Sequence, residues 1–258
     1  MRVLVIGGSG HLGTLVMPFL AQHHNLRVFD LRPPADSSVA YTRGSACDPI
    51  ALAGAVLDMD AVLYMAMGSH PQVGGGAGRI EARVTAFDVN VKGLHLALHA
   101  AHGAGIQHTV YTSSMSVYAG KGVGRIGADE DTPPDATDLY GFTKRLGEEV
   151  CRNACREWGM SVNALRLFQP VPEEKWLAEA RRGEPTPWTT AGDTARALLA
   201  ALEYRDGFQA FTISGDHEQK LMNLAKAKRL LGWKPLARPQ NKGRPPNGPP
   251  SDSDIAES

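Results

Sequence analysis

The stretch VLVIGGSGHLG, residues 3–13, decides the fold. It joins four aliphatic residues, typical of a buried strand, to a glycine-rich turn and the start of a helical pattern. Gly7, Gly10 and Gly13 are spaced G-x-x-G-x-x-G, and glycine permits a tight turn whose backbone can approach a pyrophosphate at a helix N-terminus. A strand, a glycine turn and a helix in this order predict a dinucleotide-binding unit.

The rest of the chain alternates short apolar runs with longer helical patterns. Strands are predicted at 2–6, 26–30, 39–46, 61–66, 108–113, 161–168 and 208–214. Helices are predicted at 11–22, 81–102, 139–158, 193–204 and 223–232. This alternation favours βαβ units and a buried parallel sheet, so we expect an α/β, Rossmann-type doubly wound fold.

Composition divides the chain into three parts. We expect residues 1–168 to form the nucleotide-binding core with the catalytic residues, and 169–236 to form a small, abbreviated substrate-binding portion. Residues 237–258 are rich in Pro, Gly, Ser and charge, so we expect a disordered tail.

The charge balance argues against nucleic acid or a membrane as the main partner. The chain has 258 residues, 43% of them hydrophobic, with 27 basic and 27 acidic side chains. No apolar run approaches the ~18 residues of a membrane span. Three cysteines provide no disulfide framework. We expect a soluble, cytoplasmic protein.

Asp30 is a candidate for selecting the dinucleotide. It closes the predicted second strand, and a carboxylate there can bind the ribose hydroxyls of NAD and repel a 2′-phosphate. Arg32 lies two residues further on and can soften this preference. The sequence therefore predicts NAD over NADP.

Tyr140 and Lys144 form a candidate acid/base pair. A spacing of four residues puts both side chains on one face of the predicted helix 139–158. Asp138 is a plausible N-cap, which would place Tyr140 in the first turn. A nearby ammonium and the positive end of the helix dipole both favour the phenolate, so we expect the pKa of Tyr140 to be lowered.

Taken in order, these motifs resemble the extended short-chain dehydrogenase/reductases, the NAD-dependent epimerase/dehydratase family. The resemblance covers roughly residues 2–235. It implies that Asp48 meets the adenine, that Ala66 lines the cofactor and that Asn90 stabilises a central helix. The cofactor-binding residues that it implies are Gly7, Gly10, His11, Leu12, Gly13, Asp30, Asp48, Ala66, Asn90, Tyr140 and Lys144.

The same resemblance implies the catalytic residues. Tyr140 would be the general acid/base, and Lys144 would lower its pKa and hold the nicotinamide ribose. Ser114, from the segment YTSSMSVY, would hydrogen-bond the reacting oxygen. Hydride transfer at a carbon needs a base near the oxygen of that carbon, which agrees with this assignment.

Departures from the family pattern bear on the substrate. Met115 and Ser116 stand where 4,6-dehydratases carry an Asp-Glu pair, which disfavours dehydration. The connection between 168 and 188 is short for a segment that grips a nucleotide. We therefore expect NAD-dependent oxidation of a small, sugar-like substrate. The alternatives are a nucleotide-sugar 4-epimerase and a non-catalytic dinucleotide-sensing regulator.

Two further groups of residues have a functional and an ordinary structural interpretation. Ser69 and His70 are either substrate contacts or ordinary loop residues. His95, His99 and His102 lie on one face of the predicted helix 81–102, and without a carboxylate or thiol partner we expect no metal there.

We also expect a homodimer. The predicted helix 81–102 carries one apolar stripe through Val84, Phe87, Val91 and Leu94 and a second through Leu96 and Ala100, and a helix that is apolar on two faces is usually buried on both. We expect the dimer to be built on the predicted helices 81–102 and 139–158, and in the family that the chain resembles the first of these commonly packs in a dimer interface.

Overall fold

A parallel sheet of seven strands forms the centre of the protein, which we describe from a computed structural model at residues 1–68, 80–120, 129–183 and 185–239. The strand order is β3-β2-β1-β4-β5-β6-β9, and every pair is parallel. The strands are β1 (Arg2–Ile6), β2 (Asn25–Asp30), β3 (Ala40–Arg43), β4 (Ala61–Tyr64), β5 (His108–Ser114), β6 (Ser161–Leu167) and β9 (Phe208–Ile213). The expected doubly wound α/β class is confirmed.

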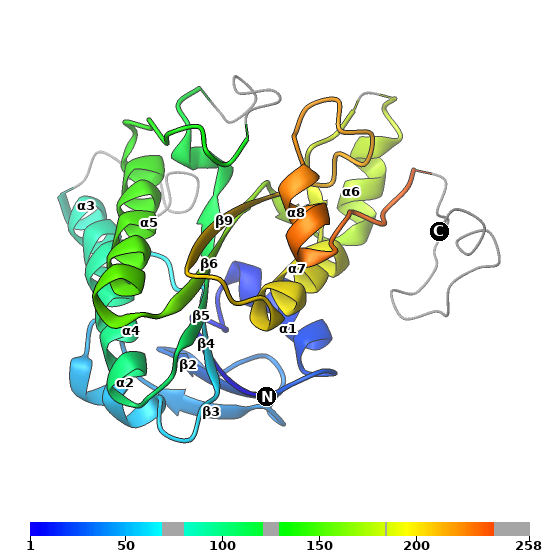
Figure 1. Cartoon of the computed structure of the whole chain (residues 1–258). Coiled ribbons are helices and arrows are strands. Elements are labelled where there is room, and N and C mark those ends of the chain that lie inside the picture. The colour runs from blue at the N-terminus through cyan, green and yellow to red at the C-terminus, as the bar shows by residue number, and fades with distance from the viewer. Residues whose placement is uncertain (69–79, 121–128, 184, 240–258) are drawn as a thin grey trace.

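Helices cover both faces of this sheet (Figure 1). One face carries α1 (His11–Leu20), α7 (Ala191–Glu203) and α8 (Ala225–Leu231). The other carries α2 (Pro49–Ala55), α4 (Leu94–Gly103) and α5 (Leu139–Trp158). Successive side chains of a strand point to opposite faces, so Val3 and Val5 enter one core while Leu4 and Ile6 enter the other. Burial on both faces explains the continuous apolar run in β1.

The predicted helix 81–102 is divided in the structure. α3 (Ile80–Phe87) and α4 are joined by a π-helical segment, Asp88–Gly93. A Cβ on Gly93 would lie 2.8 Å from the Tyr64 hydroxyl, so glycine is needed where this segment approaches β4. The irregular turn also brings Asn90 into the interior, where it is 1% exposed.

Several shorter elements were not predicted from the sequence. α2 begins directly after Asp48, and α6 (Glu173–Ala180) occupies part of a segment that looked loop-like because of its prolines. The strands β7 (Pro170–Val171) and β8 (Thr189–Thr190) form a separate parallel pair beside α6. These elements shape the region beyond the carboxyl end of β6.

Contacts at the end of the folded part continue past Leu236. The N–H groups of Leu236 and Ala237 both donate to the Asp193 carboxylate, at 3.1 and 3.2 Å. Ala237 also packs against the small apolar cluster around Trp176. The folded part thus extends at least one residue beyond the boundary expected from composition. In the part of the chain described here, no helix is long and apolar enough to span a membrane.

Candidate active site

The glycine turn lies at the carboxyl end of β1, where the strand order reverses between β1 and β4. Gly7 has a φ of 85°, and its N–H donates to Phe29 O at 3.0 Å. A Cβ at this position would overlap the backbone of Ala66, because the turn passes directly against the end of β4. Open α/β sheets bind ligands beyond the carboxyl ends of their strands at such a reversal of strand order.

The remaining residues of the turn begin α1. Gly10 N donates to Gly7 O at 3.1 Å, which closes the turn. A Cβ on Gly13 would overlap the carbonyl of Gly8, so glycine allows the helix to start close to the strand. His11 is exposed at the first position of α1, whereas Leu12 is partly buried against the core.

Asp30 is tied to the glycine turn. Its carboxylate accepts from Ser9 N at 3.0 Å and from Arg32 N at 3.2 Å. Ser9 Oγ in turn donates to Arg32 O at 2.7 Å, and the Arg32 guanidinium donates to Ser9 O at 3.4 Å. The structure therefore brings both predicted determinants of cofactor choice to the same edge of the turn.

Asp48 and Asn90 both accept hydrogen bonds from backbone N–H groups. The resemblance implied that Asp48 meets the adenine and that Asn90 stabilises a central helix. Asp48 Oδ1 accepts from Ile50 N at 3.0 Å and from Ala51 N at 3.1 Å, so Asp48 is the N-cap of α2. Asn90 Oδ1 accepts from Gly68 N at 2.9 Å, which fixes the chain that leaves β4.

Asn90 also reaches α5, the helix that carries two of the predicted catalytic residues. Its Nδ2 donates to Thr143 Oγ1 at 2.9 Å in the interior. Thr143 lies between Tyr140 and Lys144 on α5, so Asn90 connects β4 to the helix that carries both residues.

The three predicted catalytic residues come together at the ends of β5 and α5. Ser114 is the last residue of β5 and hydrogen-bonds Tyr140, which lies in the first turn of α5. Asp138 caps that helix through Gly141 N at 3.0 Å, as the sequence predicted. Lys144 is only 3% exposed, and its Nζ donates to Thr112 O at 2.7 Å.

The pKa of Tyr140 moves in the direction opposite to our expectation. Burial raises it, and the hydrogen bond with Ser114 only partly opposes that effect. The Lys144 ammonium lies 5.9 Å from the Tyr140 ring centre and 5.0 Å from that of Tyr111. Burial also lowers the pKa of Lys144 to about 8. In the protein alone, the phenol is thus protonated at neutral pH.

Sequence reasoning missed a buried ion pair behind this site. Glu148 on α5 and Arg166 on β6 are 1% and 0% exposed, and Arg166 Nη2 lies 2.8 Å from Glu148 Oε2. Ser113 Oγ donates to Glu148 Oε1 at 2.7 Å. The available signal was the position of Glu148, four residues after Lys144 on the same helical face.

Two groups of residues singled out in the sequence remain: the pair Ser69 and His70, and the three histidines of the predicted helix 81–102. Ser69 and His70 lie outside the described residues. The ring centres of His95, His99 and His102 lie 5.7, 5.7 and 5.4 Å from that of Trp158, so these histidines surround an indole. No group of three His, Cys, Asp or Glu suited to a metal ion occurs within the described ranges.

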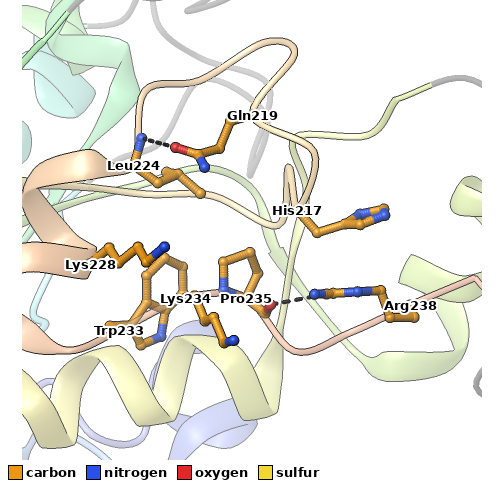
Figure 2. Close-up of a pocket in the computed structure, with 8 residues that line it drawn as sticks. All are labelled: His217, Gln219, Leu224, Lys228, Trp233, Lys234, Pro235 and Arg238. Carbon is orange, nitrogen blue, oxygen red and sulfur yellow. Dashed lines mark hydrogen bonds between the residues drawn. The ribbon is translucent and has the colours of Figure 1, made fainter. Parts of the chain in front are cut away.

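A small cavity of about 140 Å³ lies in the C-terminal portion (Figure 2). Basic side chains surround it, and Figure 2 shows His217 and Arg238 on one side and Lys228 above Trp233 on the other. Its lining residues are His217, Gln219, Leu224, Lys228, Trp233, Lys234, Pro235 and Arg238. None of the predicted catalytic residues is among them, so this cavity is separate from the proposed chemistry.

Comparison with known proteins places this site in context. The sequence profile described as the NAD dependent epimerase/dehydratase family matches residues 3–183. The chain is 39% identical over 171 residues to a 3 beta-hydroxysteroid dehydrogenase/Delta 5-->4-isomerase of Mycobacterium tuberculosis, covering 64% of this chain and 46% of that protein. It is 28% identical over 178 residues to a UDP-glucose 4-epimerase of Lactobacillus helveticus, covering 65% and 51%.

The chain spans about half the length of these curated relatives. A solved structure of a short-chain dehydrogenase/reductase superfamily protein from Agrobacterium tumefaciens, with bound NAD, superposes with a TM-score of 0.75 at 22% identity. That comparison covers 92% of this chain and 93% of the other, and it supports the fold. Because the family profile matches well over half of the residues, this chain belongs to the NAD-dependent epimerase/dehydratase family.

Proposed function

We propose that the protein is an NAD-dependent oxidoreductase that acts on a hydroxyl or carbonyl group of a small, sugar-like substrate. The observation that carries this proposal is the hydrogen-bonded pair of Ser114 and Tyr140, with Lys144 one turn further along α5. All three lie at the same edge of the sheet as the glycine turn. This arrangement supplies a proton-transfer group beside a dinucleotide crevice.

Each residue has a defined part in the reaction. NAD, when bound, supplies the hydride acceptor. For oxidation, Tyr140 must first lose its own proton to solvent; the phenolate then takes the proton of the substrate hydroxyl, and in the reverse direction the protonated phenol gives its proton to the carbonyl oxygen. Ser114 donates a hydrogen bond to the same oxygen. Lys144 would hold the nicotinamide ribose of bound NAD and would favour the phenolate. The hydrogen bond with Ser114 opposes the effect of burial on the Tyr140 phenol.

The residues at the glycine turn fit NAD. Asp30 presents a carboxylate where a 2′-phosphate of NADP would approach, and Ser9 N and Arg32 N hold that carboxylate in place. Arg32 is itself bound to the backbone of Ser9. In Asp30→Ala, NAD affinity should fall clearly. Titration of the unmodified protein with both dinucleotides tests this assignment. If NADP binds as tightly as NAD, Arg32 and not Asp30 determines how the ribose is recognised.

The segment beyond β6 favours a substrate without a nucleotide. Diphosphates are usually gripped by Arg or Lys forks or by helix N-termini. Here Arg182 pairs with Glu179 at 2.7 Å, and Lys175 Nζ lies 5.5 Å from the centre of the Trp188 ring. Arg181 is exposed at the end of α6 and can reach a single carboxylate, which keeps a sugar acid among the candidates.

A 4-epimerase is the second candidate function, and the similarity to the Lactobacillus helveticus enzyme favours it. The decisive assay measures NADH formation with free aldoses, uronic acids, simple secondary alcohols and a 3β-hydroxysteroid, beside UDP- and GDP-sugars. We expect net NADH from a substrate without a nucleotide. Reaction with nucleotide sugars alone, with NAD retained, would establish the epimerase. Binding of NAD without turnover of any substrate would indicate a sensor.

We also propose that the protein forms a homodimer through α3 and α5. Ile80, Val84 and Phe87 follow one face of α3 and are 67%, 53% and 40% exposed. Phe87 contacts Phe142 of α5 edge to face, at 6.0 Å between ring centres. Leu94, in contrast, is fully buried against the sheet, so the predicted stripe is divided between the core and the surface.

A further inference from the structure

Arg166 is a fully buried cation on β6, the strand beside the edge strand β9. Its Nε and Nη2 donate to the two oxygens of Glu148 at 2.9 and 2.8 Å, a bidentate arrangement. Its Nη1 donates to Tyr118 Oη at 2.5 Å and to Glu130 O at 3.2 Å. One guanidinium therefore joins β6, α5 and the chain on either side of the segment 121–128.

Glu148 is positioned to attract the catalytic lysine. It lies four residues after Lys144 on α5, the spacing at which a lysine and a carboxylate meet on a helix. Lys144 instead donates to the backbone oxygen of Thr112. The next residue, Ser113, donates its hydroxyl to Glu148 at 2.7 Å. Lys144 and Glu148 thus bind neighbouring residues of β5. Among the described residues, no hydrogen bond joins their two side chains.

Arg166 is the stronger competitor for this carboxylate. A planar guanidinium matches both carboxylate oxygens, whereas an ammonium acts as a point charge. Together with Ser113, Arg166 supplies three donors to the two oxygens of Glu148. The carboxylate is thereby satisfied, so the Lys144 ammonium has less to gain from leaving Thr112.

Other ionisable groups around the lysine do not provide an alternative partner. The titratable side chains near Lys144 come from β5 and α5: Tyr111, Tyr140, Glu148 and Cys151. Burial raises the pKa of Tyr111 and that of Cys151 well above their usual values, so both are neutral at neutral pH. Glu130, beyond Arg166, directs its carboxylate to Thr212 N at 2.8 Å.

We propose that Arg166 is a positioning residue that keeps Glu148 from capturing Lys144. The ammonium then remains on the Thr112 carbonyl, 5.9 Å from the Tyr140 ring centre, where it would hold the nicotinamide ribose of bound NAD. The importance of this for turnover rests on the proposed function. The charge arrangement itself can be tested without a substrate.

The test follows the titration of Lys144 in protein labelled with ¹³C-lysine, with its NMR signal assigned from Lys144→Met. In Arg166→Met, Glu148 keeps only the Ser113 hydroxyl, loses its cationic partner and attracts the ammonium, so we expect the pKa of Lys144 to rise by at least one unit. In Arg166→Met/Glu148→Gln, the competing carboxylate is gone and the pKa should return to the value of the unmodified protein or below it. An unchanged pKa in Arg166→Met would overturn the proposal.

Arg152→Met is the matched control. Arg152 also lies on α5 and pairs with Glu149 at 3.2 Å, but this pair is at the surface. Its loss should leave the Lys144 signal unchanged. If Arg166→Met does not fold, Arg166→Lys keeps the charge but loses the bidentate geometry, and a smaller rise in the Lys144 pKa is expected. No rise in Arg166→Lys would then overturn the proposal.

Turnover gives a second readout once a substrate is known. Arg166→Met should lower kcat at least tenfold, and the double variant should recover most of it although it lacks two native side chains. A role limited to stability predicts no such recovery in variants that are fully folded, as judged by circular dichroism. Failure to find any substrate would count against the proposed function, but it would leave the lysine titration valid.

Discussion

Replacing Lys144 with Met should make the protein more stable while removing its activity. Lys144 is 3% exposed, and burial lowers its pKa from 10.5 to about 8. Each pKa unit corresponds to about 1.4 kcal/mol, so keeping the ammonium charged in the folded protein destabilises it by about 3 kcal/mol at pH 7. Loss of the hydrogen bond to Thr112 O removes about 1–2 kcal/mol of this gain. A net stabilisation of about 1–2 kcal/mol remains.

The pH dependence gives this prediction its sign. The pKa of Lys144 is lower in the folded protein, so between about pH 8 and 10.5 the unfolded chain binds more protons and stability rises with pH. The destabilising effect of the ammonium is complete below about pH 8 and disappears as the pH approaches 10.5. The advantage of Lys144→Met should therefore be largest at pH 7 and be lost by pH 10.

Urea unfolding at both pH values, without added dinucleotide, measures this difference. Bound ligand must be absent because it stabilises only the folded protein. Lys92→Met is the control, since Lys92 is 55% exposed and pairs with Asp88 at the surface. If Lys144→Met is less stable than the unmodified protein at pH 7, or if its gain is equal at pH 10, the reasoning about burial is wrong.

Four further changes test other parts of the structure. Tyr140→Phe deletes only a hydroxyl and should abolish turnover with an unchanged circular dichroism spectrum, so near-full activity would remove Tyr140 as the acid/base. Gly7→Ala places a Cβ against the end of β4 at a φ of 85° and should lower stability by more than about 2 kcal/mol, measured by urea unfolding. Val84→Lys should convert a dimer to a monomer in light scattering; a monomer already in the unmodified protein would contradict the proposed interface. Truncation after Pro239 should change neither assembly nor melting temperature, whereas a lower melting temperature would show that the tail contributes to the fold.

Local sequence patterns determined the class of the fold, and they also indicated the candidate catalytic residues. The glycine turn, the alternation of strands with helices and the four-residue spacing of Tyr140 and Lys144 each depend on neighbouring residues. The position of Asp138 as the cap of α5 belongs to the same class, because a cap contacts only the first helical turn. Such signals can be read without knowing which segments pack together.

Tertiary structure decided the properties that depend on distant partners. Glu148 and Arg166 are 18 residues apart in sequence and become an ion pair only when α5 packs on the sheet beside β6. The pKa of Tyr140 was predicted in the wrong direction for a related reason. Helical spacing reveals that a lysine is near, but the extent to which water is excluded depends on the whole fold, and here desolvation raises the pKa of Tyr140 by more than the hydrogen bond with Ser114 lowers it.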